Sequence, residues 1–165
     1  MPAHTPPDSG NESGERARPA LRRAGAGDAS GIAECVRAAY SRYIERIGRP
    51  PGPMLDDYDQ VVRDHRAYVI EEDGEILGAL VLIEKDRGLL LDNVAVLPSR
   101  HGKGVGRRLL VHAESEARRL GYGHLDLYTH ERMTENVAMY ERIGYVEVDR
   151  RTEHGFPRVY MRKRL

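Results

Sequence analysis

The hydrophobic and polar positions in the first third of the chain predict a short strand followed by two helices. Apolar side chains recur at every third or fourth position between residues 28 and 47, which is typical of an amphipathic helix. Asp28 is a candidate cap for this helix, and the glycines and prolines of residues 48–53 end it. We expect a strand over 20–24 and a second helix over 55–65. The apolar positions of the first helix are Ile32, Cys35, Val36, Ala39, Tyr40, Tyr43, Ile44 and Ile47.

From residue 67 onward the pattern is mainly that of strands. Two runs flank Asp73-Gly74, a dipeptide that favours a tight hairpin turn. Two later segments have helical spacing, one from residue 105 to Gly121 and one over 135–144. The expected order, β-α-α-β-β-β-α-β-α-β-β, indicates an α/β protein with mixed strand directions. The expected strands of this part are 67–72, 75–84, 89–97, 123–130, 145–151 and 158–165.

Length and composition narrow the class of protein. The chain of 165 residues suits one domain, which we place at 18–165, after a disordered tail at 1–17 rich in Pro, Gly, Ser and charge. Its 26 basic and 26 acidic side chains cancel, so composition favours neither a nucleic-acid nor a membrane partner. No apolar run suits a signal peptide or a membrane span, and a cytoplasmic location follows as an expectation. One cysteine and seven scattered histidines predict no metal site.

The stretch RHGKGVGRRLL, residues 100–110, carries the first chemical signal. Glycines in a strand-to-helix turn let backbone N–H groups converge on one point, and the helix dipole adds to it. Lys103, Arg107 and Arg108 would surround this point with positive charge, which suits a diphosphate. A tight surface turn with solvated arginines is the other interpretation. The patterns of phosphate-binding P-loops and of dinucleotide-binding folds are both absent.

Together, VAVLPSRHGKGVGRRLL (94–110) and ENVAMYERIGYVEV (135–148) resemble the GNAT superfamily of N-acetyltransferases. The resemblance spans about residues 19–165. It implies a mixed, largely antiparallel sheet flanked by helices on both faces. It also implies acetyl transfer from acetyl-CoA, as cosubstrate and without a metal, to a primary amine that attacks the thioester directly. A non-catalytic acyl-CoA sensor of the same fold is the alternative, and a homodimer is compatible with the fold by analogy.

The resemblance also assigns roles to residues. Backbone groups of Val94, Ala95 and Val96 would pair with the pantetheine arm, and Tyr140 would reach the sulfur and protonate the leaving thiolate. Packing on the sheet is the other interpretation of Tyr140. Asn136 either replaces an asparagine that many members carry at the position of Met133, or helps to start the helix. The residues implied at the pyrophosphate are His101, in place of the usual Gln or Arg, with Gly102, Lys103, Gly104, Val105, Gly106 and Arg107.

An amine acceptor starts as ammonium, so a proton acceptor is needed near the site. Alternation along 89–97 predicts that Asp92 shares a face with Val94 and Val96, which makes Asp92 the leading candidate base. It could instead only orient the acceptor. His130, on the neighbouring strand, and the adjacent Glu131 are the rival bases.

The acceptor itself is a small-molecule or peptide amine that the sequence does not identify. The acidic segment 56–59 around Tyr58 suits a cationic amine by its charge. The other interpretation is that Asp56 and Asp57 stabilise a helix start.

Overall fold

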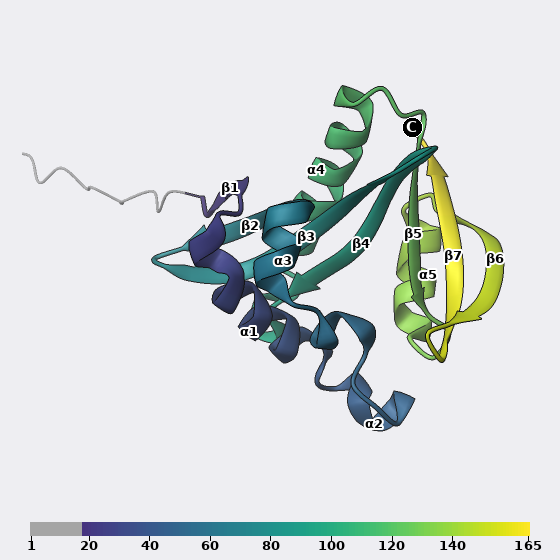
Figure 1. Ribbon diagram of the computed structural model, residues 1–165, viewed down its shortest axis with the longest axis horizontal. Coiled ribbons are helices and arrows are strands. Elements are labelled where there is room, and N and C mark those ends of the chain that lie inside the picture. Colours follow the sequence, from purple (N-terminus) through teal and green to yellow (C-terminus); the bar gives the residue numbers. More distant parts are fainter. Residues whose placement is uncertain (1–17) are drawn as a thin grey trace, which may run out of the picture.

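The protein is built on one seven-stranded sheet with the strand order β1-β2-β3-β4-β5-β7-β6 (Figure 1). The computed structural model describes residues 18–165, and the tail expected over 1–17 lies outside them. The strands are β1 Ala20–Arg23, β2 Arg66–Glu72, β3 Glu75–Lys85, β4 Gly88–Val96, β5 His124–His130, β6 Val146–Glu153 and β7 Phe156–Arg164. The helices are α1 Ala29–Tyr40, α2 Tyr43–Ile47, α3 Tyr58–Asp64, α4 Val105–Arg119 and α5 Thr134–Arg142.

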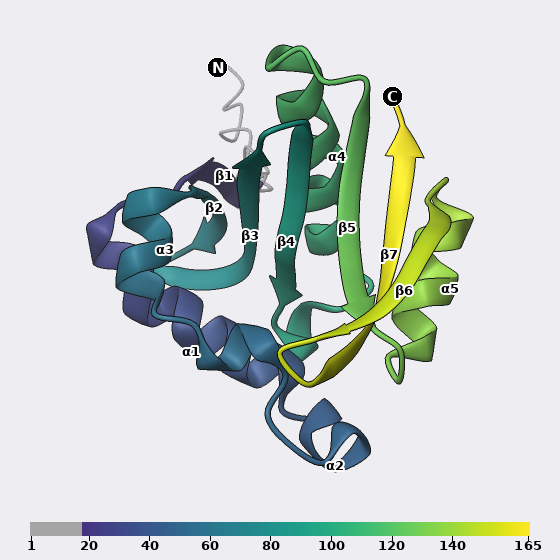
Figure 2. The same ribbon diagram turned by 45° about the vertical axis from the view of Figure 1, so that its right-hand side comes forward.

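The sheet is largely antiparallel and has helices on both faces, as predicted. β4 and β5 pair in parallel, and the other neighbouring strands pair antiparallel. Leu109 of α4 and Tyr140 of α5 belong to one buried cluster, whereas Ile32 of α1 belongs to another on the opposite face. Figure 2 shows α4 and α5 behind the sheet and α1 and α3 in front of β2 and β3. No helix within residues 18–165 is long and apolar enough to cross a membrane.

The first predicted helix is wrong in its second half, because the structure breaks it after Tyr40. Ser41 and Arg42 form a turn in which the N–H of Ile44 donates to the carbonyl of Ser41 at 3.2 Å. The N–H and the hydroxyl of Ser41 both bond to the Arg37 carbonyl, a pattern that often bends a helix. The apolar residues beyond the break form the separate short helix α2.

The sequence prediction starts the second helix at residue 55, whereas α3 begins at Tyr58. Asp57 is the N-cap of α3, and its carboxylate accepts from the N–H groups of Asp59 (3.1 Å) and Gln60 (3.3 Å). Residues 52–55 form a short 3-10 turn instead. The carboxylate of Asp28, predicted to cap α1, makes no capping bond there and accepts from Gly25 and Arg22.

The central strand β4 is irregular where the candidate site begins. Its register against β3 shifts between Val81 and Leu82. Asp92 therefore has no paired residue on β3 and forms a bulge. The predicted alternation is therefore wrong across Asp92: Val94 and Val96 pack against the same cluster as Leu89 and Leu91. The pairing with β5 also stops at Leu91 and Leu127. Beyond it the two strands diverge and leave the β5 side of residues 94–96 unpaired.

Candidate functional site

A groove of about 420 Å³ runs along the unpaired end of β4, past the start of α4, to the side of α5. We call it the cofactor groove. Of the predicted cofactor residues, Lys103 does not line it. Those that do are Val94, Ala95, Val96, His101, Gly102, Gly104, Val105, Gly106, Arg107, Asn136 and Tyr140. The prediction missed Tyr40, Arg42, Tyr43, Arg100, Leu110 and Met139 among the other lining residues.

The turn before α4 presents a row of free backbone donors. The N–H groups from Gly102 to Arg107 donate no backbone hydrogen bond within residues 18–165, and the first one along this segment runs from Arg108 N–H to the Gly104 carbonyl. Gly102 (φ +73°) and Gly104 (φ +84°) have left-handed conformations that other residues rarely adopt. Gly104 is the N-cap of α4 and supplies no side chain to cover these donors. The cradle therefore fits a diphosphate.

The side chains around the cradle differ from the predicted set. Arg107 lines the groove, but the guanidinium of Arg108 turns away and donates to the Pro19 carbonyl at 2.7 Å. Nε2 of His101 lies 3.2 Å from the carbonyl oxygen of Val96, so the imidazole is held against the strand. The prediction that Arg108 adds charge at this point is wrong, and backbone donors with Arg107 dominate the cradle.

Tyr140 lines the far end of the cofactor groove and is 6% exposed. Burial raises the pKa of its phenol above the ordinary value, so the phenol stays protonated at neutral pH. The hydroxyl makes no side-chain hydrogen bond within the described part of the chain, while the ring packs edge-on against Tyr145 at 5.6 Å between centroids. A fixed phenol with an uncommitted proton is suited to act as an acid.

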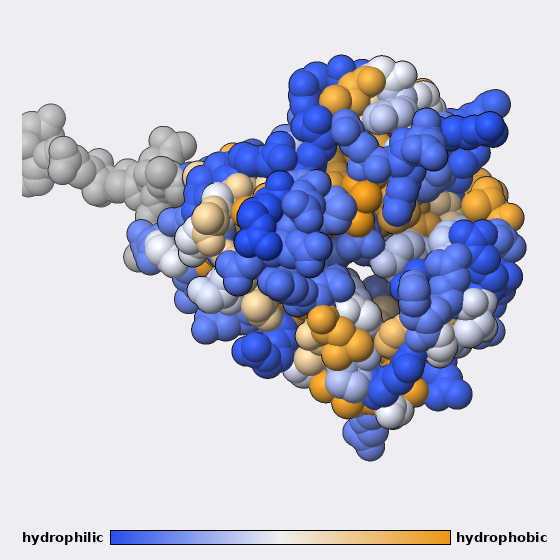
Figure 3. All heavy atoms as spheres, in the orientation of Figure 1, coloured by the Kyte–Doolittle hydropathy of each residue, from blue (hydrophilic) through white to orange (hydrophobic). Residues whose placement is uncertain are grey.

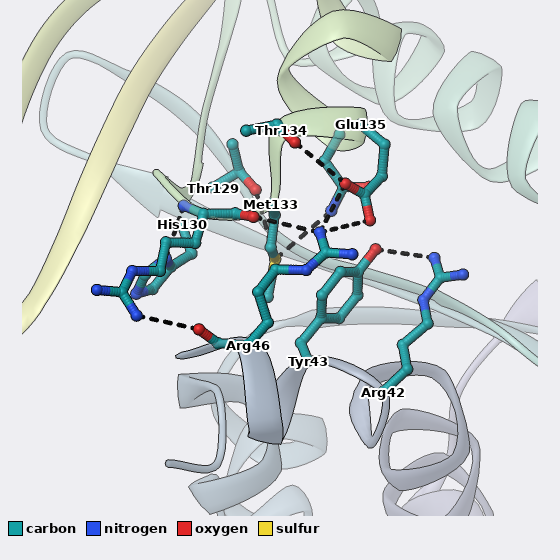
Figure 4. Close-up of polar contacts among 10 residues, drawn as sticks. Arg42, Tyr43, Arg46, Thr129, His130, Met133, Thr134 and Glu135 are labelled. Atoms are coloured by element: carbon teal, nitrogen blue, oxygen red, sulfur yellow. Dashed lines mark hydrogen bonds and ion pairs between the residues drawn. The ribbon is translucent and has the colours of Figure 1, made fainter. Parts of the chain in front are cut away.

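A polar bridge joins the segment after α1 to the start of α5 (Figure 4). Nη1 of Arg46 lies 2.7 Å from both carboxylate oxygens of Glu135, and Nη1 of Arg132 donates to the Arg46 carbonyl at 3.0 Å. Beside the bridge, the hydroxyl of Tyr43 accepts from Arg42 at 2.8 Å. Arg42 and Tyr43 line the cofactor groove, so the bridge fixes one of its walls. No local sequence pattern indicates a contact between residues this far apart.

A smaller slot lies on the other side of Tyr40, which lines both the slot and the cofactor groove. Asp92 lines this slot, and its Oδ1 accepts from the Tyr128 hydroxyl at 2.8 Å. Asp92 and Tyr128 also line a wider groove that continues over the open face of β4, β5 and β7. The molecular surface is hollowed between the half with α1 and α3 and the half with β5 to β7 (Figure 3). The remaining residues of the slot are Pro51, Gly52, Pro53, Thr129, His130, Met133, Phe156 and Arg158.

The two rival bases have less favourable surroundings than Asp92. Nδ1 of His130 already accepts the N–H of Arg132 at 3.0 Å. Burial, with the charge of Arg132, lowers the pKa of His130, so its ring is neutral and carries its proton on Nε2. Glu131 is exposed, lines neither the slot nor the wider groove, and lies 3.5 Å from Arg150.

The acidic segment before α3 divides into two roles. Asp57 caps the helix, as one interpretation predicted. Asp56 instead lines the wider groove together with Asp92. Burial, and then the charge of Asp92, raise the pKa of Asp56 to about 6. Neither carboxylate forms an ion pair with a described residue. Five basic residues line the same groove: Lys85, Arg87, Arg151, Arg158 and Arg162.

The Asp56 carboxyl makes stability depend on pH. The folded protein keeps this proton up to about pH 6, whereas the unfolded chain releases it near the ordinary pKa of 3.8. The free energy of unfolding therefore falls as pH rises through this window. We expect Asp56→Asn to match the wild type in melting temperature near pH 4. Above pH 7 the variant should exceed it by about 2–4 °C, or about 1 kcal/mol after allowance for solvent screening of a partly exposed group. Melts of Asp59→Asn, a helix-start control, should show no such gain.

Comparison with known proteins agrees with this geometry. Residues 33–145 match the acetyltransferase (GNAT) family. The uncharacterized N-acetyltransferase YjgM of Escherichia coli is 30% identical over 141 residues, covering 79% of this chain and 84% of the relative. A streptothricin acetyltransferase of Streptomyces lavendulae is 33% identical over 85 residues, or 50% of this chain and 45% of that protein.

The fold has solved counterparts as well. The PaiA N-acetyltransferase of Thermoplasma acidophilum, in complex with coenzyme A, superimposes with a TM-score of 0.74 at 17% identity. This comparison covers 88% of the present chain and 98% of the other. The residues that match the family, 33–145, include most of α1 and all of β4, the glycine cradle, α4 and Tyr140. The protein is therefore a member of the GNAT acetyltransferase family.

Proposed function

We propose that the protein transfers an acetyl group from acetyl-CoA to a primary amine of a small molecule or peptide. The observation that carries the proposal is spatial. The N–H cradle and the protonated Tyr140 line one groove, and Tyr40 lines both that groove and the slot of Asp92. Cosubstrate and acceptor would thus meet beside Tyr40.

The residues of the cofactor groove fit acetyl-CoA, which supplies the acetyl group as a thioester. The N–H groups from Gly102 to Arg107 would hold the diphosphate. The backbone of Val94 to Val96, unpaired on its β5 side, would hold the pantetheine arm as an added strand. Tyr40 donates to the Asn93 side chain at 2.9 Å and lies 3.1 Å from the Val94 carbonyl, which fixes this part of β4.

Asp92 is the proposed base. With a lysine-like pKa, only about 1 amine in 2,500 is neutral at pH 7. The Asp92 carboxylate takes the ammonium proton, and the hydrogen bond from Tyr128 keeps it facing the slot. The nitrogen lone pair then forms the C–N bond as the C–S bond breaks, and the nitrogen loses its second proton to water as the neutral amide forms.

Tyr140 is the proposed acid: its phenolic proton passes to the sulfur as the thiolate leaves. Transfer is direct, because the chain's single thiol is poorly suited to carry the acetyl group. Cys35 is buried in α1, does not line the cofactor groove, and burial raises its pKa to about 12.

The acceptor is proposed to be cationic. Arg151, Arg158 and Arg162 of the wider groove are paired with acidic side chains, whereas Asp56 and Asp92 form no ion pair with a described residue. These two carboxylates therefore favour an ammonium group beside them by electrostatic attraction. One relative is named for streptothricin, so streptothricin belongs among the first acceptors to be tested, beside a polyamine and peptides with a free N-terminus.

Two measurements test the function. Saturating acetyl-CoA, at about 100 times its dissociation constant, should raise the melting temperature by roughly 5–10 °C. Release of free thiol should then depend on both acetyl-CoA and one of the amine classes. A thermal shift without thiol release from any amine would instead indicate an acyl-CoA sensor, and no shift would refute the cofactor site.

A further inference from the structure

A second pocket lies at the α4 N-terminus and is lined jointly by Leu21 of β1 and by residues of the first turns of α4. Its volume is about 650 Å³. Gly104 and Arg107 line both this pocket and the cofactor groove, so the two are separated only by the first turn of α4. Arg18 and Arg108 line the new pocket and not the groove. We call it the α4–β1 pocket.

The α4–β1 pocket has a positive charge that nothing in its described lining neutralises. Arg18, Arg107 and Arg108 supply three guanidinium groups, and no aspartate or glutamate is among the described residues that line it. Arg108 is partly buried, and its Nη1 is fixed by the Pro19 carbonyl at 2.7 Å. Burial, with the charge of Arg18, lowers the pKa of Arg108. Clustered guanidinium groups of this kind are stabilised by an anion, most of all by a phosphate.

We propose that the α4–β1 pocket binds the 3′-phosphate on the ribose of CoA, with Arg18 and Arg108 as the residues that select CoA esters over their dephospho forms. The inference rests on the proposed function, since it requires the diphosphate in the cradle. In CoA the 3′-phosphate lies one ribose away from the diphosphate. Gly104 and Arg107 are thus placed to face the diphosphate on one side and the 3′-phosphate on the other.

A free anion has the same chemistry as this phosphate monoester. The continuity of the two sites favours the attached phosphate, because the cradle already brings it to the pocket at high effective concentration. A monoester carries nearly two negative charges at neutral pH and accepts paired bonds from guanidinium groups.

The test measures dissociation constants of acetyl-CoA and 3′-dephospho-acetyl-CoA by calorimetry, so that activity is not the readout. Wild-type protein should bind acetyl-CoA about 10-fold more tightly than the dephospho form. Arg18→Gln and Arg108→Gln should each weaken acetyl-CoA binding about threefold or more and leave dephospho-acetyl-CoA within about twofold. Arg108→Lys, which keeps the charge, should restore part of the preference. Arg63→Gln on α3, which removes the same charge and lines none of these pockets, should not change the ratio.

The results that would contradict this inference differ from the result that would refute the proposed function. Equal affinity of the wild type for both esters, or equal losses for both in the Arg18→Gln variant, would overturn the inference and leave the proposed function intact. Arg18 is exposed and its side chain makes no hydrogen bond to the described residues, so its variant tests the inference even if Arg108→Gln fails to fold. Stabilisation by inorganic phosphate that depends on Arg18, with no preference between the esters, would show an independent anion site instead. Failure of the wild type to bind either ester would refute both proposals.

Discussion

Tyr140→Phe is expected to lower the turnover number by about 100-fold or more while the dissociation constant of acetyl-CoA stays within about twofold. The substitution removes only the hydroxyl, and that hydroxyl makes no side-chain hydrogen bond to the described residues. The ring keeps its packing against Tyr145. The lost function is therefore proton donation to the thiolate, which affects the reaction and not the binding of the ester.

Tyr145→Phe is the matched control, because it removes a buried hydroxyl from the same aromatic pair. The Tyr145 hydroxyl has no hydrogen-bond partner among the described residues, and Tyr145 does not line the cofactor groove. Single-turnover rates and cofactor affinities should be measured for both variants. Wild-type turnover in Tyr140→Phe would remove this residue as the acid. A matching fall in Tyr145→Phe would show that the loss is not specific to the hydroxyl that lines the groove.

The order of strands and helices could be predicted because apolar residues recur with a different period in helices than in strands. Asp73 and Gly74 have the positive φ angles (51° and 80°) that the dipeptide predicted for a hairpin. The wrong predictions concern local irregularities, which the spacing of apolar residues does not reveal. α1 ends at Tyr40 within an unbroken apolar pattern. The bulge at Asp92 reverses the faces of β4, because its register against β3 shifts there.

The cofactor groove was predictable for a different reason: its cradle is one contiguous segment whose glycines have a direct conformational meaning. The slot that contains Asp92 was predicted only in part. Asp92 and His130 could be selected as polar residues on neighbouring strands, but Phe156 and Arg158 come from the last hairpin and Pro51 from the loop before α3. Contacts between segments this far apart depend on the complete fold, and one sequence does not encode them in any local pattern.

Gly104→Asp is expected to reduce acetyl-CoA affinity at least about 100-fold relative to Gly104→Asn. Both substitutions have the same shape, and both residue types tolerate the left-handed conformation better than others. A Cβ at residue 104 meets no atom within 4 Å, so both side chains leave the backbone into open space. The difference between the variants is one negative charge at the cradle, and a charge about 4 Å from a phosphate costs several kcal/mol in a partly shielded site.

The comparison of these two variants tests the cradle more cleanly than either variant against the wild type. Gly104→Asn reports the effect of bulk and of backbone strain, and we expect it to retain measurable binding. Melting temperatures without ligand should be similar for the two, since neither side chain is buried. Calorimetric titration with acetyl-CoA measures the difference in affinity, which should shrink as salt screens the added charge. Equal affinities for both variants would mean that no phosphate lies at the N-terminus of α4, and the glycines would then serve only the turn.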